Sequence, residues 1–151
     1  MPAEDRAAAH AKALELLARR EHSQEELRTK LRTRGFSSED AETAITDLAD
    51  KGFQSDDRFL ELFVAGRVAR GQGPIKIAAE LRARGLTGEM VESTLNSRAE
   101  RWCDLAYTVR KRRFGLDPPM DTQERSAQMR FLAQRGFNSE QVRAAFRIVD
   151  D

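Results

Sequence analysis

The 151-residue sequence has few of the residues on which disulfide-stabilised, metal-binding or membrane proteins depend. Its single cysteine, Cys103, excludes an internal disulfide, and two histidines give little material for a metal site. No apolar run approaches membrane-spanning length, and residues 1–6 lack the apolar core of a signal peptide. We therefore expect a soluble cytoplasmic protein with no membrane association.

The sequence also has almost no net charge. The formal charge is +1, although the 26 basic residues comprise 21 arginines and only five lysines. A dedicated nucleic-acid domain is usually more basic, whereas arginine suits bidentate contacts with carboxylate or phosphate groups. The composition slightly favours a soluble helical surface with many ion pairs. A surface that binds a protein or phosphate partner is the alternative interpretation.

One seven-residue pattern occurs three times. Leu-x-x-Arg-Gly-apolar-(Ser/Thr/Asn) covers residues 31–37, 81–87 and 132–138, and its glycines lie 50 and 51 residues apart. Glycine adopts the left-handed conformation that ends many helices, and Ser, Thr or Asn caps the next helix. The pattern therefore predicts a junction between two helices in each of three repeats.

The segments beside these junctions have helical periodicity. Ser23 with Glu26 has the spacing of a capping box, and no segment alternates as a strand would. Apolar residues recur at i, i+3, i+4 and i+7 in two of the repeats: Ala41, Ala44, Ile45 and Leu48, then Val142, Ala145, Phe146 and Val149. We expect an all-α protein of three tandem three-helix repeats, residues 1–52, 53–97 and 98–151, in an elongated array.

Three local features carry separate expectations. No helix breaker separates residues 88–97 from 98–113, which predicts one long helix there. Asp56 has the position of an N-cap for the following helix. His22 precedes the predicted cap Ser23, and we expect its side chain to be exposed.

No catalytic, cofactor or metal motif is complete. Gly66 and Gly71 have the glycine spacing of a phosphate-binding loop, but Gln72 stands where the motif needs lysine. The two histidines and Cys103 have no recognisable zinc-ligand spacing. We predict that the protein is not an enzyme and binds no metal or cofactor.

The charges are grouped along the chain. Residues 19–34, 66–85 and 98–113 are mainly basic, whereas residues 37–61 hold eight acidic and two basic residues. If the repeats stack in register, the bases of 28–32 could form a track with Lys76 and Arg82, suited to a phosphate backbone or an acidic protein surface. Ordinary solvated helix faces are an equally good explanation.

The sequence resembles the RecX family of regulatory proteins. Residues 20–31, REHSQEELRTKL, are similar to the opening signature of the family, Arg-x-x-Ser-x-x-Glu-Leu-x-x-Lys-Leu. Residues 56–81 resemble its central motif, and residues 135–137 fit its third repeat. The resemblance extends from about Ala11 to Val149.

The resemblance implies a curved molecule that binds the RecA recombinase, above all its filament on single-stranded DNA. It implies negative regulation of recombination, DNA repair and the SOS response by blocking filament growth, ATP hydrolysis and strand exchange. Direct contact with single- or double-stranded DNA stays open, and we expect the protein to be a monomer. The candidate partner-binding residues are the cations of the matching motifs and basic segments: Arg20, Arg28, Lys30, Arg32, Arg67, Lys76, Arg82, Arg110, Lys111, Arg112 and Arg113.

Two other functions are compatible with the same residues. A three-helix unit could bind DNA directly through a recognition helix, although nothing marks a base-reading helix and the net charge is low. The protein could also be a helical adaptor with another partner. Steep loss of affinity with salt would distinguish direct DNA binding.

Overall fold

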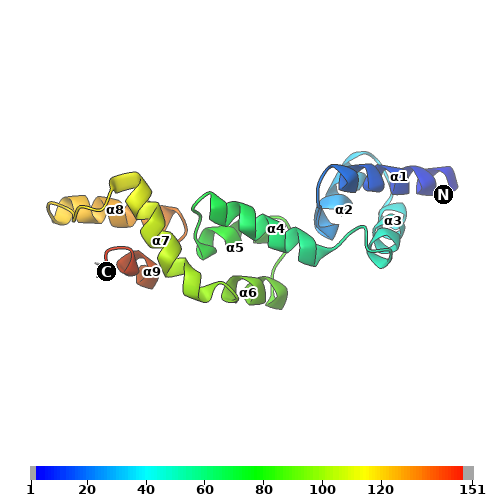
Figure 1. Cartoon of the computed structure of the whole chain (residues 1–151). Coiled ribbons are helices and arrows are strands. Elements are labelled where there is room, and N and C mark those ends of the chain that lie inside the picture. The colour runs from blue at the N-terminus through cyan, green and yellow to red at the C-terminus, as the bar shows by residue number, and fades with distance from the viewer. Residues whose placement is uncertain (1–2, 148–151) are drawn as a thin grey trace. The chain divides into compact units, whose positions relative to one another are not determined.

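The computed structural model describes residues 3–147, and every regular element in that range is an α-helix (Figure 1). None of these helices has the length and apolar character needed to cross a membrane. The helices are α1 (Ala3–Arg19), α2 (Gln24–Thr33), α3 (Ser38–Asp50), α4 (Asp56–Ala69), α5 (Pro74–Ala83), α6 (Glu89–Asn96), α7 (Ala99–Phe114), α8 (Thr122–Gln134) and α9 (Ser139–Ala144).

The chain divides into two compact units. The first contains the residues up to Leu62 together with Arg84–Leu86, and the second contains Phe63–Ala83 together with the residues from Thr87 onward. The expected all-helical fold is confirmed. The boundaries predicted between repeats, at 52/53 and 97/98, stay a prediction.

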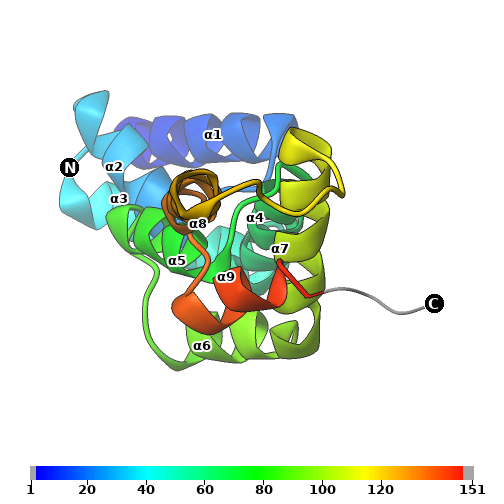
Figure 2. The same ribbon diagram turned by 90° about the vertical axis from the view of Figure 1, so that its left-hand side faces the viewer.

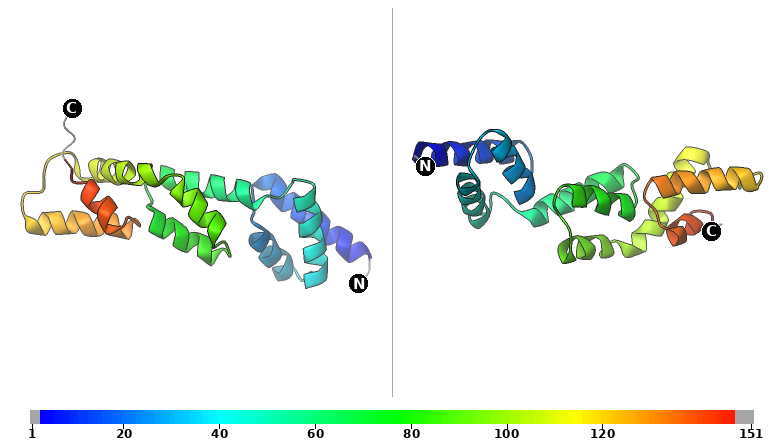
Figure 3. Two further views of the ribbon diagram at one scale, coloured as in Figure 1. Left: turned by 90° about the horizontal axis from the view of Figure 1, so that it is seen from below. Right: turned by 180° about the vertical axis from the view of Figure 1, so that it is seen from behind.

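In the first unit, α1, α2 and α3 pack around a shared apolar core (Figure 3). The periodic positions predicted on α3 all face it, since Ala41, Ala44, Ile45 and Leu48 are buried. Ser23 begins α2 with the predicted capping box, and the Ser37 hydroxyl accepts a hydrogen bond from the backbone N–H of Asp40. The sequence signals for this unit are thus local and mutually consistent.

In the second unit, α7, α8 and α9 enclose another core, and Figure 2 shows α9 beside α7. This core contains Ala106, Val109, Leu132, Phe137, Val142 and Ala145. Phe146 packs against it half-buried, whereas Val149 lies outside the described residues. Asn138 opens α9 with the predicted capping box to Gln141.

The repeated junction has the conformation that its pattern predicts. Gly35, Gly85 and Gly136 have φ values of 91°, 81° and 100°, in the left-handed region. The backbone N–H groups of Phe36 and Phe137 donate to the carbonyls of Leu31 and Leu132, which closes the end of each preceding helix. In the second copy Thr87 does not cap α6, because Gly88 holds the N-cap position without a side-chain hydrogen bond.

The junction at Gly136 packs directly on the start of α5. The backbone N–H of Gly73 donates to the carbonyl of Arg135 at 2.7 Å, and that of Ile75 donates to Gly136 at 3.0 Å. A Cβ on Gly73 would lie 2.5 Å from the carbonyl carbon of Gly136. The absence of both side chains is therefore what lets the two backbones meet.

The prediction of one long helix over 88–113 is wrong. Two helices are present, and Ser97 and Arg98 separate α6 from α7. The Trp102 indole N–H donates to the carbonyl of Leu95 at 3.1 Å, and the Ser97 hydroxyl donates to that of Thr94 at 2.7 Å. These bonds satisfy carbonyls at the end of α6, so the helix can stop without a glycine or proline.

Asp56 also has a different role from the predicted one. Ser55 supplies the capping oxygen of α4, because its hydroxyl accepts the backbone N–H of Arg58 at 3.2 Å. The Asp56 carboxylate instead accepts the backbone N–H of Gln24 and the side-chain amide of Gln54, each at 2.9 Å. Asp56 therefore ties the first turn of α4 to that of α2.

Candidate functional site

Arg20 lies at the junction of α1 and α2, where it pairs with Glu26. Two of its guanidinium nitrogens approach the two carboxylate oxygens of Glu26 at 3.3 and 3.2 Å, and Arg84 approaches the same carboxylate at 3.2 Å. Burial opposes ionisation of Glu26, but hydrogen bonds from Arg20 and from the Ser23 backbone outweigh it and lower its pKa. Two arginines thus share one carboxylate, which leaves an excess of positive charge at this junction.

Lys30 is brought to the same junction through His22. Lys30 Nζ lies 2.9 Å from His22 Nε2, and His22 Nδ1 lies 3.0 Å from the carbonyl oxygen of Arg20. An ammonium group can only donate, so Nε2 accepts and Nδ1 carries the proton. The expectation of an exposed His22 is wrong, since its side chain is only 1% exposed.

Burial explains the electrostatics of this pair. Desolvation lowers the pKa of His22, and the neighbouring charges of Arg20 and Lys30 act in the same direction. The pKa of Lys30 is lowered as well, first by burial and then by Arg20. The buried imidazole is therefore neutral, and its hydrogen bond with Lys30 holds the ammonium group at this junction.

The remaining candidates on α2 differ sharply. Arg28 is paired with Glu42 and Glu25, and its hydrogen bond to Glu42 is the main cause of its raised pKa. Arg32 is exposed, and its side chain makes no hydrogen bond or ion pair with any described residue. On α2, only Arg32 is therefore a fully available cation.

The same contrast occurs on α4 and α5 in the second unit. Arg67 pairs with Glu80 and lies 4.4 Å above the centre of the Phe63 ring. Within residues 3–147 nothing pairs with the side chains of Lys76, which is half-buried, or Arg82, which is exposed. Arg67 therefore contributes to packing, whereas Lys76 and Arg82 keep their charges uncompensated.

The basic end of α7 contains one buried and three exposed cations. Arg110 is 5% exposed and donates to Gln128, Ala145 and Asp117. Lys111, Arg112 and Arg113 are exposed, and Arg113 lies 5.6 Å from the rings of Phe114 and Phe131. The structure therefore gives Arg110 an internal position that the basic run did not indicate.

The structure thus brings some candidates together and separates their roles. Arg20 and Lys30 meet at one junction, and the exposed candidates without a described carboxylate partner are Arg32, Arg82, Lys111, Arg112 and Arg113. The track predicted from Arg28, Lys30 and Arg32 to Lys76 and Arg82 stays a prediction. Within residues 3–147 no group of acidic, histidine or cysteine side chains could hold a metal ion.

Sequence reasoning missed several residues that shape these sites. Arg84, the arginine of the second junction pattern, reaches Glu26. Gln54, 3% exposed, donates to the carbonyl of His22 and to Asp56. The contact of Gln54 with His22 joins residues 32 positions apart and that of Arg84 with Glu26 joins residues 58 apart, and no local signal in the sequence identifies them.

Comparison with known proteins identifies the family. Sequence models of the first, second and third three-helix domains of RecX match residues 9–48, 55–95 and 99–146. The chain belongs to the RecX family. Regulatory protein RecX of Halorhodospira halophila is 44% identical over 139 residues, covering 92% of this chain and 86% of that protein. Its counterpart in Chromohalobacter salexigens is 47% identical over 133 residues, covering 88% and 87%.

Solved structures agree with the fold. The crystal structure of RecX from Lactobacillus salivarius has a TM-score of 0.83 at 19% identity and covers 95% of this chain and 96% of its own. Another crystal structure of regulatory protein RecX has a TM-score of 0.78 at 20% identity, covering 93% of this chain and 71% of its own.

Membership of a family of regulatory proteins confirms the prediction that the chain is not an enzyme.

Proposed function

We propose that this RecX protein inhibits RecA by binding RecA and its filament on single-stranded DNA. In this proposal it limits filament growth, ATP hydrolysis and strand exchange, and thereby recombination, DNA repair and the SOS response. The protein acts in the cytoplasm as a monomer of three repeats, residues 1–52, 53–97 and 98–151.

The observation that carries this proposal is the set of cations that the fold leaves without a carboxylate. Arg28 and Arg67 are neutralised by ion pairs, whereas Arg32, Arg82 and Arg112 have no described partner. Unpaired surface arginines lose no internal ion pair when they meet an acidic or phosphate-bearing surface. A nucleoprotein filament offers both kinds of surface.

The test is the single-stranded-DNA-dependent ATPase of RecA, titrated with the protein in buffer where the protein alone does not coat the DNA. We expect inhibition at substoichiometric concentration. Arg82→Glu should raise the concentration for half-inhibition about ten-fold, equivalent to ~1.4 kcal/mol, with the helical circular dichroism unchanged. Full ATPase activity at saturating protein would contradict the proposal.

Arg130→Glu is the matched control. Arg130 is an exposed arginine of α8 in the same unit, it has no described side-chain partner, and it is not among the candidates. Both substitutions change the net charge by the same amount. Equal losses for Arg82→Glu and Arg130→Glu would show that total charge matters and that Arg82 has no particular role.

Direct DNA binding is the alternative, and salt separates it from RecA binding. A protein that reaches the filament through DNA phosphates alone should lose affinity steeply as salt rises, and it should bind DNA equally well without RecA. The near-neutral net charge and the internal pairing of Arg28 and Arg67 favour binding through RecA over binding through DNA phosphates alone.

A further inference from the structure

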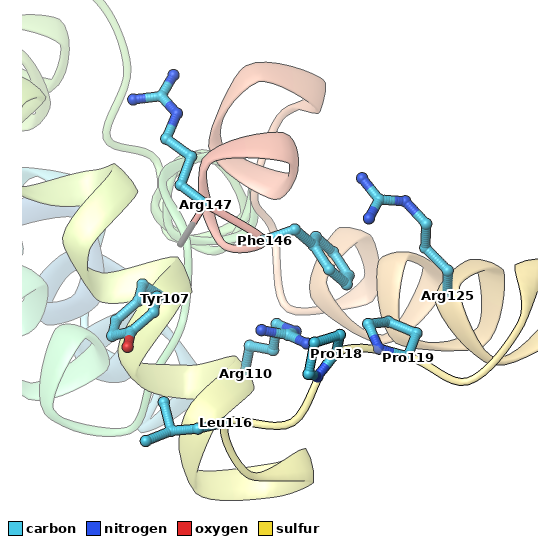
Figure 4. A pocket seen from close by; sticks show the side chains of 8 residues that line it. All are labelled: Tyr107, Arg110, Leu116, Pro118, Pro119, Arg125, Phe146 and Arg147. Atoms are coloured by element: carbon cyan, nitrogen blue, oxygen red, sulfur yellow. The ribbon is translucent and has the colours of Figure 1, made fainter. Parts of the chain in front are cut away.

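A pocket of about 410 Å³ lies among α7, α8, the loop between them and the residues after α9 (Figure 4). Its size is in the range of small-molecule sites, roughly 300–1,000 Å³. The lining residues are Tyr107, Arg110, Leu116, Pro118, Pro119, Arg125, Phe146 and Arg147. Three of these are arginines and none is acidic, so the lining itself is positively charged.

Arg110 is the buried part of this charge. Its hydrogen bonds to the described residues all go to neutral oxygens: the side chain of Gln128 and the carbonyls of Ala145 and Asp117. These acceptors take three of its five N–H groups and leave its charge without a counter-ion among the described residues, whereas buried charges in proteins are normally paired. Burial lowers the pKa of Arg110, and repulsion from Arg125 lowers it further.

Arg125 makes the site a pair. Its guanidinium carbon lies 4.5 Å from the centre of the Phe146 ring, and that of Arg110 lies 4.4 Å from the same centre. Arg125 makes no hydrogen bond or ion pair with another described side chain. The Phe146 ring lies between the two guanidinium groups in Figure 4, and their charges still repel each other, so an anion in the pocket would stabilise this arrangement.

The rest of the lining distinguishes between kinds of anion. Pro118 and Pro119 lie next to the arginines in Figure 4, Leu116 and Tyr107 extend the wall along α7, and Arg147 stands at the rim with its guanidinium directed away. These apolar and aromatic surfaces offer contact area to a flat ring, whereas a bare inorganic anion would use none of it.

We propose that this pocket binds a nucleotide, with its phosphate at the arginine guanidinium groups of the lining and its base against the proline, leucine and tyrosine wall. The guanidinium groups match the planar, multiply hydrogen-bonded recognition of phosphate. A free mononucleotide and one nucleotide of a DNA strand present the same chemistry. The inference does not depend on RecA, because the pocket is complete within this chain.

The experiment is a titration of the full chain followed by the side-chain Nε–H resonances of arginine in ¹⁵N-labelled protein. The probes are dAMP, inorganic phosphate and a short oligo(dT). We expect dAMP to shift the Arg110 and Arg125 resonances while Arg130 stays unchanged, and to bind at least several-fold more tightly than inorganic phosphate. Shifts with oligo(dT) alone or with dAMP alone would support the pocket and identify the source as a strand or a free nucleotide.

Substitutions on α8 give the control. Arg125→Gln should weaken dAMP binding about ten-fold by isothermal titration calorimetry. Arg130→Gln is the same change on the same helix at a residue that does not line the pocket, and it should leave dAMP binding unchanged. Equal effects of the two substitutions, equal affinity for phosphate and dAMP, or unshifted Arg110 and Arg125 resonances would each overturn the proposal. The RecA ATPase titration is separate, so each proposal can fail without the other.

Discussion

Replacing Gly73 by alanine should destabilise the second unit by about 2–6 kcal/mol. A Cβ at this position would lie 2.5 Å from the carbonyl carbon and oxygen of Gly136 and 2.7 Å from the Phe137 nitrogen. These are backbone atoms and cannot move aside as a flexible side chain could. Overpacking costs roughly 1–3 kcal/mol, and each of the two hydrogen bonds that hold this contact contributes about 0.5–1.5 kcal/mol.

Trp102 makes this measurement specific. It is the only tryptophan, is 4% exposed and belongs to α7, so its fluorescence during urea denaturation reports on the second unit. Gly66→Ala is the control, because Gly66 is helical and a Cβ there would meet nothing within 4 Å. This change should stabilise the protein by up to about 1 kcal/mol. If Gly73→Ala fell within about 0.5 kcal/mol of the wild type, the close approach of Gly73 and Gly136 would not hold this unit together.

Three further changes test the first unit by denaturation. The free energy of unfolding of this unit should fall as pH drops below about 6.5, because burial lowers the folded-state pKa of His22 and the unfolded chain therefore binds the proton first. His22→Gln should flatten this dependence of stability on pH. The control His10→Gln should leave the dependence in place. Ser23→Ala should cost about 1 kcal/mol by removing the cap of α2, whereas Ser38→Ala, at an exposed position that caps nothing, should stay within about 0.5 kcal/mol of the wild type. Asp56→Ala should cost about 1–3 kcal/mol, because the buried amide of Gln54 and the Gln24 backbone lose their acceptor; Asp57→Ala, at its exposed neighbour, is the control.

Most of the fold could be predicted because its signals are local. A glycine with positive φ, a capping serine and apolar residues at helical spacing each act within about one helical turn of their own position. The break between α6 and α7 could not be predicted in this way. It depends on the indole of Trp102, seven residues beyond the carbonyl that it satisfies, and on no breaker residue.

The site was less predictable because charge in a sequence does not show which charges are paired. Arg28 and Arg32 occur in the same basic segment, yet Glu42 of the next helix neutralises only Arg28. Arg110 belongs to a run of four cations, but the face of α7 that carries it turns inward. Only the tertiary arrangement separates these residues from their exposed neighbours.

The repeat itself helps to decide which arginines serve the fold. The arginine before each junction glycine occurs in all three copies; Arg84 bonds to Glu26, and Arg135 bonds to the carbonyl of Arg70 at 3.2 Å. Recurrence at this position therefore has a structural cause in two copies and is weak support for partner binding. Arg32 and Arg82 also occupy equivalent positions, each directly after the junction leucine, but neither has a described internal partner. Arg32 and Arg82 are therefore the better candidates for a contact with RecA, because no described contact within the fold explains why an arginine recurs at this position.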